Sequence, residues 1–268
     1  MNVRLPIGAI VLGLVMFFGG LVGGCGLLPE VKDETGNWSV ERIFQTGREA
    51  VQEGNYLRAI KLFESLESRY PYGPYAQQSI LQQAYANYKL GEMAAAVSAA
   101  DRFIKLYPNH ANVDYAYYLK GLANFNEDFG FLTFLADQDL SERDPKTLRE
   151  SYNAFRDLVA KFPESRYAGD STARMRFLVN ALASGEVHVA RYYYNRGAYI
   201  AAASRAQSAM ITYPSAPVVE DALVIMVNAY DKLKLTELRD DTRRVLEKNF
   251  PKSAALTGDR SNPWWKVW

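Results

Sequence analysis

An aromatic residue followed directly by proline recurs five times along this chain of 268 residues. Proline cannot continue a helix and restricts the residue before it, so each pair predicts the end of a helix. The pairs are Tyr70-Pro71, Tyr107-Pro108, Phe162-Pro163, Tyr213-Pro214 and Phe250-Pro251, and their prolines lie 37, 55, 51 and 37 residues apart. A period of this length is typical of stacked repeats rather than of one closed core.

The residues ahead of each stop resemble the tetratricopeptide pattern from Ser39 to Pro251. Before Pro71, Phe63 occupies a position where the pattern has a large residue, and Ala59 occupies a position where it has a small one. Gly54 and Gly47 occupy two positions where the chain makes a close approach. Small residues let paired helices approach, and large ones fill the gap to the next unit. Matching positions in later units are Ala84, Gly91, Ala96, Phe155, Gly197, Tyr199, Ala202 and Leu246.

Apolar residues recur at helical spacing before each stop. Between Tyr56 and Tyr70 they form one stripe, with charged residues outside it. Similar stripes cover Ala76 to Leu90, Met93 to Tyr107, Tyr152 to Phe162 and Ala216 to Leu233, and we find no alternating run long enough for a sheet. The sequence therefore predicts an all-α fold, an α-solenoid of five tetratricopeptide-like helix pairs with an insertion in the third.

The two long intervals predict two different departures from the repeat. Between Pro163 and Pro214 the excess is 14 residues, close to four helical turns, which a longer first helix from about Gly169 to Asn195 absorbs. Between Pro108 and Pro163 the excess is 18 residues, and the sequence becomes aromatic and then charged. We interpret residues 127–146 as an insertion loop whose aromatic residues either pack on the solenoid or meet a partner.

The N-terminal residues indicate export. One basic residue, Arg4, precedes an apolar run and small residues that end at Cys25, which is typical of a secretory signal. The end of the run also resembles a bacterial lipobox, which predicts a signal peptide at 1–24, a lipidated tether at 25–38, and a diacylglycerol and an acyl chain on Cys25. An uncleaved membrane helix of 18 residues, Ile7 to Gly24, and an unmodified secreted protein are the alternatives. Six glycines in that stretch, and no basic stop after it, count against the helix.

Composition argues against several classes of function. Without residues 1–24 the chain keeps 30 of its 31 basic residues against 30 acidic ones, a neutral balance that disfavours nucleic acid as a partner. Acylation of Cys25, the only cysteine, would leave no thiol for disulfides, catalysis or metal binding.

The two histidines, His110 and His188, complete no catalytic or zinc motif, and we interpret His110 as a turn or cap residue. The acidic run after Phe134 lacks the glycine and the twelfth-position acid of a calcium loop. We expect no enzyme, no metal and no cofactor beyond the lipid.

Five ordered stretches resemble the BamD (ComL/YfiO) family of bacterial lipoproteins. They are Arg69–Gln78, Asp101–His110, Asn112–Tyr115, Ser141–Pro145 and Arg196–Tyr199. The resemblance implies a non-enzymatic scaffold of the outer-membrane β-barrel assembly machinery, anchored by lipid on the periplasmic face of the outer membrane. It implies binding to BamA and other Bam lipoproteins, and recognition of unfolded outer membrane proteins for folding and insertion.

The same resemblance places the BamA side in the C-terminal repeats, residues 147–252. Arg205 matches an arginine that the family uses against BamA, and Arg196 lies nine positions before it. From the sequence alone, Arg205 is a polar residue on the second helix of the fourth unit. A position exposed to solvent would explain an arginine there without any partner. An arginine paired with a carboxylate is a common interface anchor.

The N-terminal repeats, residues 39–126, are implied to receive the C-terminal targeting strand of substrates. Tyrosine suits that role because it offers apolar area together with a hydroxyl group. The candidates are Tyr72, Tyr75, Tyr85 and Tyr88. Packing between helices explains Tyr85 and Tyr88 equally well.

The C-terminal tail, residues 253–268, departs from what the family implies. It ends in Pro263-Trp264-Trp265-Lys266-Val267-Trp268, and three tryptophans so close together are not expected to lie free in water. They would cap the last unit, touch a membrane interface or bind a partner. Two other functions stay open: an adaptor that recruits cell-wall hydrolases, and an assembly lipoprotein for a polysaccharide or a secretin.

Overall fold

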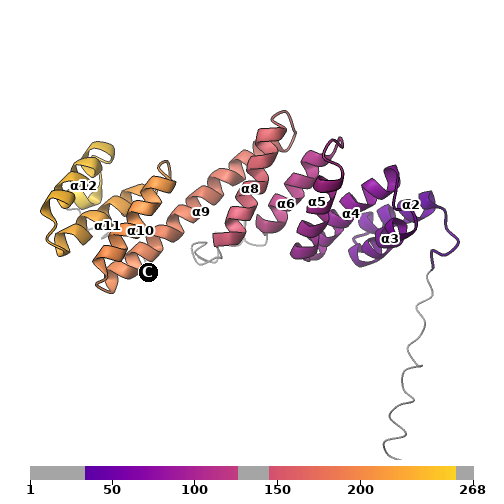
Figure 1. The fold of residues 1–268 in the computed structure, drawn as a ribbon, viewed down its shortest axis with the longest axis horizontal. Coiled ribbons are helices and arrows are strands. Elements are labelled where there is room, and N and C mark those ends of the chain that lie inside the picture. Colours follow the sequence, from indigo (N-terminus) through magenta and orange to yellow (C-terminus); the bar gives the residue numbers. More distant parts are fainter. Residues whose placement is uncertain (1–33, 126–144, 258–268) are drawn as a thin grey trace, which may run out of the picture. The chain divides into compact units, whose positions relative to one another are not determined.

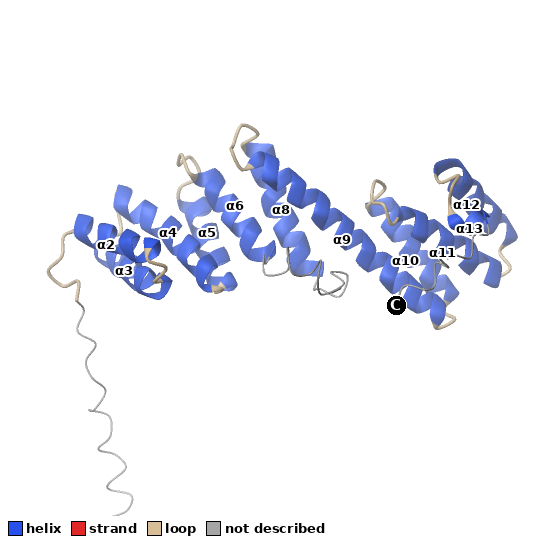
Figure 2. Cartoon of the chain, turned by 180° about the vertical axis from the view of Figure 1, so that it is seen from behind, coloured by secondary structure: helices blue, strands red, loops and turns tan. Residues whose placement is uncertain are grey.

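The structure, a computed structural model, describes residues 34–125 and 145–257, and within them every regular element is a helix (Figure 2). The chain divides into a first part, 1–38, of which only a turn at 34–37 and Trp38 are described, and a second part, 39–268. The helices of the second part are α2 (Val40–Gln52), α3 (Tyr56–Arg69), α4 (Pro74–Leu90), α5 (Met93–Leu106), α6 (Val113–Phe125), α8 (Pro145–Lys161), α9 (Ala168–Asn195), α10 (Tyr199–Thr212), α11 (Val219–Lys232), α12 (Thr236–Asn249) and α13 (Ala254–Thr257).

Each helix from α2 to α12 packs against the next described helix in chain order (Figure 1). The pairs are α2 with α3, α4 with α5, α6 with α8, α9 with α10, and α11 with α12. First helices of successive pairs also touch, α2 with α4, α4 with α6, and α9 with α11. This is the arrangement of stacked helical hairpins, so the predicted all-α fold of five tetratricopeptide-like pairs is confirmed.

All five aromatic-proline pairs stand directly after a helix. The backbone N–H of each aromatic residue donates to the carbonyl four residues earlier, over 2.7 to 2.9 Å, and closes the last turn. The following proline has no N–H with which to continue that pattern. The aromatic residues are Tyr70, Tyr107, Phe162, Tyr213 and Phe250.

Close helix approaches are made by a glycine facing a buried phenylalanine. A Cβ added at Gly47 of α2 would lie 2.6 Å from the ring of Phe63 in α3, which is fully buried. Gly121 of α6 faces Phe155 of α8 in the same way, and a Cβ there would overlap the ring. The first pair confirms the predicted close approach. Gly121 makes an equivalent approach in the third unit, where the sequence pattern identified only Phe155.

The long first helix of the fourth unit is confirmed, since α9 runs from Ala168 to Asn195. One boundary differs from the prediction. α8 begins at Pro145, inside the last two residues assigned to the insertion, because proline is favourable in the first turn of a helix. Of the insertion, residues 127–144 lie outside the described part of the chain.

The tail begins as part of the fold. α13 occupies its first residues, and Leu256 packs against a buried cluster that includes Leu223 of α11 and Leu246 of α12. Ser253 is also buried. The tryptophans of the tail, like Cys25, lie outside the described residues.

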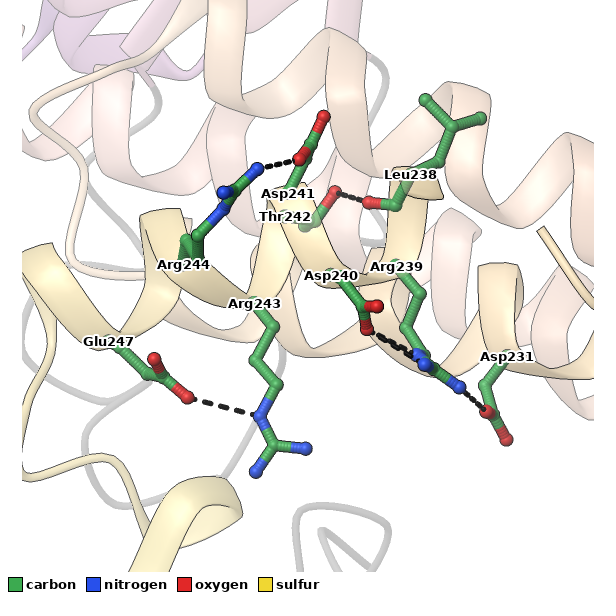
Figure 3. A network of polar contacts seen from close by, with 9 residues as sticks. All are labelled: Asp231, Leu238, Arg239, Asp240, Asp241, Thr242, Arg243, Arg244 and Glu247. Carbon is green, nitrogen blue, oxygen red and sulfur yellow. Dashed lines mark hydrogen bonds and ion pairs between the residues drawn. The ribbon is translucent and has the colours of Figure 1, made fainter. Parts of the chain in front are cut away.

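The last pair differs in character from the others because α12 is largely charged (Figure 3). Only Thr242 and Leu246 are buried in this helix. Its charged side chains pair along the surface: Arg239 with Asp231 and Asp240, Arg243 with Glu247, and Arg244 with Asp241. Terminal repeats need a polar outer face for solubility, which explains why the tetratricopeptide pattern matches this last unit mainly at Leu246.

The turn between paired helices uses a left-handed residue in four units. In three of these units the left-handed residue is a glycine, Gly54, Gly91 or Gly197, with φ of 76°, 87° and 76°. In the fifth unit Lys234 has φ of 59°, the only positive φ of a non-glycine residue among those described. A side chain in this conformation is unfavourable, whereas glycine adopts it readily.

We therefore expect Lys234→Gly to stabilise the protein by about 0.5–1 kcal/mol, since relief of the left-handed strain outweighs the entropy that glycine loses. Thermal unfolding, monitored by circular dichroism, measures this change in stability. The matched control is Lys232→Gly in the last turn of α11, which should destabilise by about 0.5–1 kcal/mol. A lower melting temperature for Lys234→Gly would contradict the prediction.

Candidate interaction surfaces

The four candidate tyrosines divide into exposed and packed positions. Tyr72 lies in the turn between α3 and α4 and is 89% exposed. Tyr75, in the first turn of α4, is half-buried, and its ring centroid lies 5.2 Å from that of Phe44 in α2. Tyr72 therefore has the geometry of a residue available to a partner, whereas Tyr75 is partly covered by its contact with α2.

Tyr85 and Tyr88 of α4 are partly buried against the core cluster that α4, α5 and α6 share. The edge of the Tyr85 ring meets Tyr56 of α3 at a centroid distance of 6.4 Å, and Tyr88 also packs on the cluster around Phe155. Packing between helices thus accounts for Tyr85 and Tyr88. This was one of the two interpretations of these residues, beside substrate capture.

A stack of three tyrosine rings joins the third and fourth units. The Tyr167 ring lies between those of Tyr115 and Tyr118, with centroid distances of 5.3 and 4.6 Å and interplanar angles of 29° and 19°. The Tyr118 hydroxyl donates to Asp170 at 2.8 Å, and the Arg166 guanidinium lies 4.7 Å from the centre of the Tyr167 ring. Burial, together with the neighbouring tyrosines, raises the pKa of Tyr115 well above its usual value and so favours the neutral phenol. The sequence pattern did not identify this stack.

The signal that the sequence offered for the stack is the i, i+3 spacing of Tyr115 and Tyr118, which puts both side chains on one face of α6. Tyr167 lies one residue before α9 and more than 45 positions further along the chain. No spacing rule connects it to α6. Only the stacking of the units brings the three rings together.

Arg205 lies on α10, the second helix of the fourth unit, as predicted, and it is paired rather than merely solvated. Its Nη1 lies 3.0 Å from a carboxylate oxygen of Glu186 on α9. Arg149 of α8 approaches the other oxygen of the same carboxylate at 4.0 Å. The Glu186 side chain is 19% exposed, while those of Arg205 and Arg149 are 49% and 58% exposed. Two guanidinium groups thus lie at the surface around one largely buried carboxylate.

Arg196 has a different environment. It is the residue that follows α9, directly before the left-handed Gly197, and its side chain lies over the ring of Tyr192 at 5.2 Å. Tyr192 is itself 52% exposed. Arg196 and Tyr192 form an exposed cation–π pair, for which no partner follows from the geometry alone.

A polar network joins the first two units in a groove lined by α3, α4 and α5. Arg102 of α5 reaches both oxygens of Glu67 on α3, at 2.9 and 3.0 Å, and the side chain of Gln83 lies between them. Gln83 is 5% exposed and bonded to both neighbours. Each charge in this network has its counterpart, so it serves to join helices.

The described residues contain no group of side chains suited to hold a metal ion. His110 accepts a hydrogen bond from the backbone of Asn112 and meets the edge of Phe103, which confirms its prediction as a turn residue. Among the described helices, none is long and apolar enough to cross a membrane.

The stacked pairs and their exposed polar and aromatic residues define a helical-repeat protein of the tetratricopeptide-like class. The chain matches the family model described as YfiO, outer membrane lipoprotein, over residues 37–246. It belongs to this family of outer membrane lipoproteins.

Relatives extend over most of the chain. A Neisseria meningitidis serogroup B protein named outer membrane protein assembly factor BamD is 53% identical, covering 87% of this chain and 89% of its own length. Proteins with the same name from Xylella fastidiosa (strain Temecula1) and Vibrio cholerae are 39% and 33% identical, over 90% and 85% of this chain. A solved tetratricopeptide-repeat protein from Thermus thermophilus aligns with 82% of this chain and 96% of its own, at 14% identity and a TM-score of 0.36.

Proposed function

We propose that this protein is a non-enzymatic scaffold of the machinery that assembles β-barrel proteins in the bacterial outer membrane. The observation that carries the proposal is the 53% identity, over 87% of the chain, to a relative named as an outer membrane protein assembly factor. The repeat fold supports it, since stacked helix pairs commonly present extended binding surfaces. The comparisons do not favour a cell-wall hydrolase adaptor or a polysaccharide or secretin lipoprotein.

The location that we propose is the periplasmic face of the outer membrane, with a diacylglycerol and an acyl chain on Cys25 as the anchor. The family description as an outer membrane lipoprotein supports it. The anchor would be needed because the mature chain carries no excess of basic residues to hold anionic lipid.

The partner that we propose for the C-terminal repeats is BamA, together with other lipoproteins of the same machinery. Arg205 supports this assignment because its guanidinium is half exposed and oriented by Glu186. A charge-assisted arginine–carboxylate contact is strong enough to anchor an interface.

We expect Arg205→Glu to reduce recovery of the barrel partner about tenfold when the protein is purified from detergent-solubilised membranes, because an attractive charge becomes a repulsive one. The test compares band intensities of the co-purified barrel protein, identified by mass spectrometry. The control Arg58→Glu makes the same change of charge at an exposed position of α3 and should leave recovery unchanged. Equal recovery with Arg205→Glu would remove Arg205 from the interface. Cell-wall hydrolases or a secretin alone in the eluate would overturn the proposed function.

For the N-terminal repeats we propose recognition of unfolded outer membrane proteins. A photo-crosslinking amino acid at position 72 should capture unfolded porin most strongly, since this side chain is 89% exposed. Position 75 should give less crosslinked porin than position 72, and the packed positions 85 and 88 should give the least. Silence at all four positions would refute their role in substrate capture.

A further inference from the structure

The Glu186 carboxylate is shared by arginines from two other helices. Arg205 comes from α10 and Arg149 from α8, and α9 carries Glu186 between them. The three residues thus connect the second helices of the third and fourth units across the first helix of the fourth. Because Glu186 is only 19% exposed, its carboxylate lies beneath the two guanidinium groups rather than beside them in solvent.

This cluster has an unbalanced charge. Two guanidinium groups face one carboxylate, which leaves a formal charge of +1. The network between the first two units provides the comparison, since Arg102 there binds both oxygens of Glu67 and the formal charge is zero. Arg205, by contrast, reaches Glu186 through a single nitrogen, and Arg149 stays at 4.0 Å.

The guanidinium groups keep donors for a further ligand. A guanidinium carries five N–H donors in a planar fork, and its strongest pairing is with a carboxylate held by two parallel hydrogen bonds. Both side chains are about half exposed, so their outer edges are open to an incoming group. Because Glu186 binds the Arg205 guanidinium at 3.0 Å, less of the side-chain freedom of Arg205 remains to be lost on binding.

We infer that Arg149 and Arg205 together bind one acidic side chain of the folded partner, with Glu186 as the positioning residue. The inference rests on the proposed function, which supplies the partner, and adds Arg149 as a second arginine on a different helix. One aspartate or glutamate between the two guanidinium groups would bring the cluster to neutrality. The contact would then span the third and fourth units rather than the fourth alone.

The test measures affinity between the full-length protein and the full-length barrel partner, both purified in detergent, by thermophoresis at low and moderate salt. Arg205→Gln should weaken binding about tenfold and Arg149→Gln about three- to tenfold. The double variant should weaken binding by less than the product of the two single losses, because both arginines would bind the same carboxylate of the partner. Arg149→Lys should recover part of the loss. Arg102→Gln is the matched control, and its affinity should be unchanged.

Failure of the inference is distinct from failure of the proposed function. Unchanged affinity with Arg149→Gln, beside a loss with Arg205→Gln, would overturn the shared site and leave the Arg205 contact in place. The shared site would also be overturned if the loss of affinity in the double variant equalled the product of the losses in the two single variants. No binding of the wild-type protein to the barrel partner would instead refute the proposed function. Weaker capture of unfolded porin, with unchanged affinity for the barrel partner, would assign the arginines to substrate and overturn the inference.

Discussion

Replacing Phe155 with alanine is expected to lower the free energy of unfolding by about 3–5 kcal/mol, the largest effect on stability that we anticipate. The ring is fully buried and lies against Gly121, where the absence of a side chain lets α6 and α8 approach. It also meets the rings of Tyr118 and Phe125, at centroid distances of 6.1 and 6.4 Å. Since the third unit links the N-terminal and C-terminal pairs, a cavity here would uncouple the two halves of the stack. Urea unfolding followed by circular dichroism measures the loss.

The control for this prediction is Phe177→Ala, which removes the same side chain from a position that is 43% exposed. It should cost no more than about 1 kcal/mol, since less apolar area returns to water. A complementary variant, Gly121→Ala, adds a methyl group that overlaps the Phe155 ring and should cost about 1–3 kcal/mol. Equal stability of Phe155→Ala and Phe177→Ala would contradict the packing argument.

Replacing Cys25 with serine is expected to release nearly all of the protein from the outer membrane into the soluble periplasmic fraction. A hydroxyl group in place of the thiol would receive no lipid, and the neutral mature chain has no basic cluster to hold it at the surface. Several acyl chains anchor a protein durably, so the wild-type protein should remain with the membrane through a salt wash. Cell fractionation and immunoblotting measure the distribution.

The folded repeats should be unaffected by this change, because they begin at Val40. The melting temperature of the released protein is therefore the control, and it should equal that of the wild type. If Cys25→Ser stays in the membrane, the apolar run from Ile7 to Gly24 acts as an uncleaved membrane helix instead. If the wild-type protein is itself soluble, the chain is an unmodified secreted protein.

The elements predicted correctly are those that local constraints decide. Every aromatic-proline pair ends a helix, because proline lacks the N–H and limits its neighbour wherever it occurs. The length of α9 followed from counting residues, since 14 extra residues make nearly four whole turns and keep the same face buried. The Gly47–Phe63 approach followed from the spacing of large and small residues within one helix pair.

The candidate site was predicted less completely. Arg205 was placed on the correct helix, but its pairing with Glu186 and the approach of Arg149 involve residues 19 and 37 positions away from that carboxylate. Tyr85 and Tyr88 are packed because α5 and α6 cover them, which their own helix does not reveal. The left-handed Lys234 was missed because lysine gives no signal for that conformation.

The class of fold, the places where helices stop and the register of the repeat could all be predicted from the amino acids, because they depend on proline chemistry and on the 3.6-residue period within single helices. Which side chains meet between units emerged only from the folded chain: the Tyr115–Tyr167–Tyr118 stack, the neutral Glu67–Arg102 network and the positively charged cluster around Glu186. Charge pairing and ring stacking act over a few ångströms. Those distances between separate helices are set by how the units stack, and no spacing along the chain encodes them.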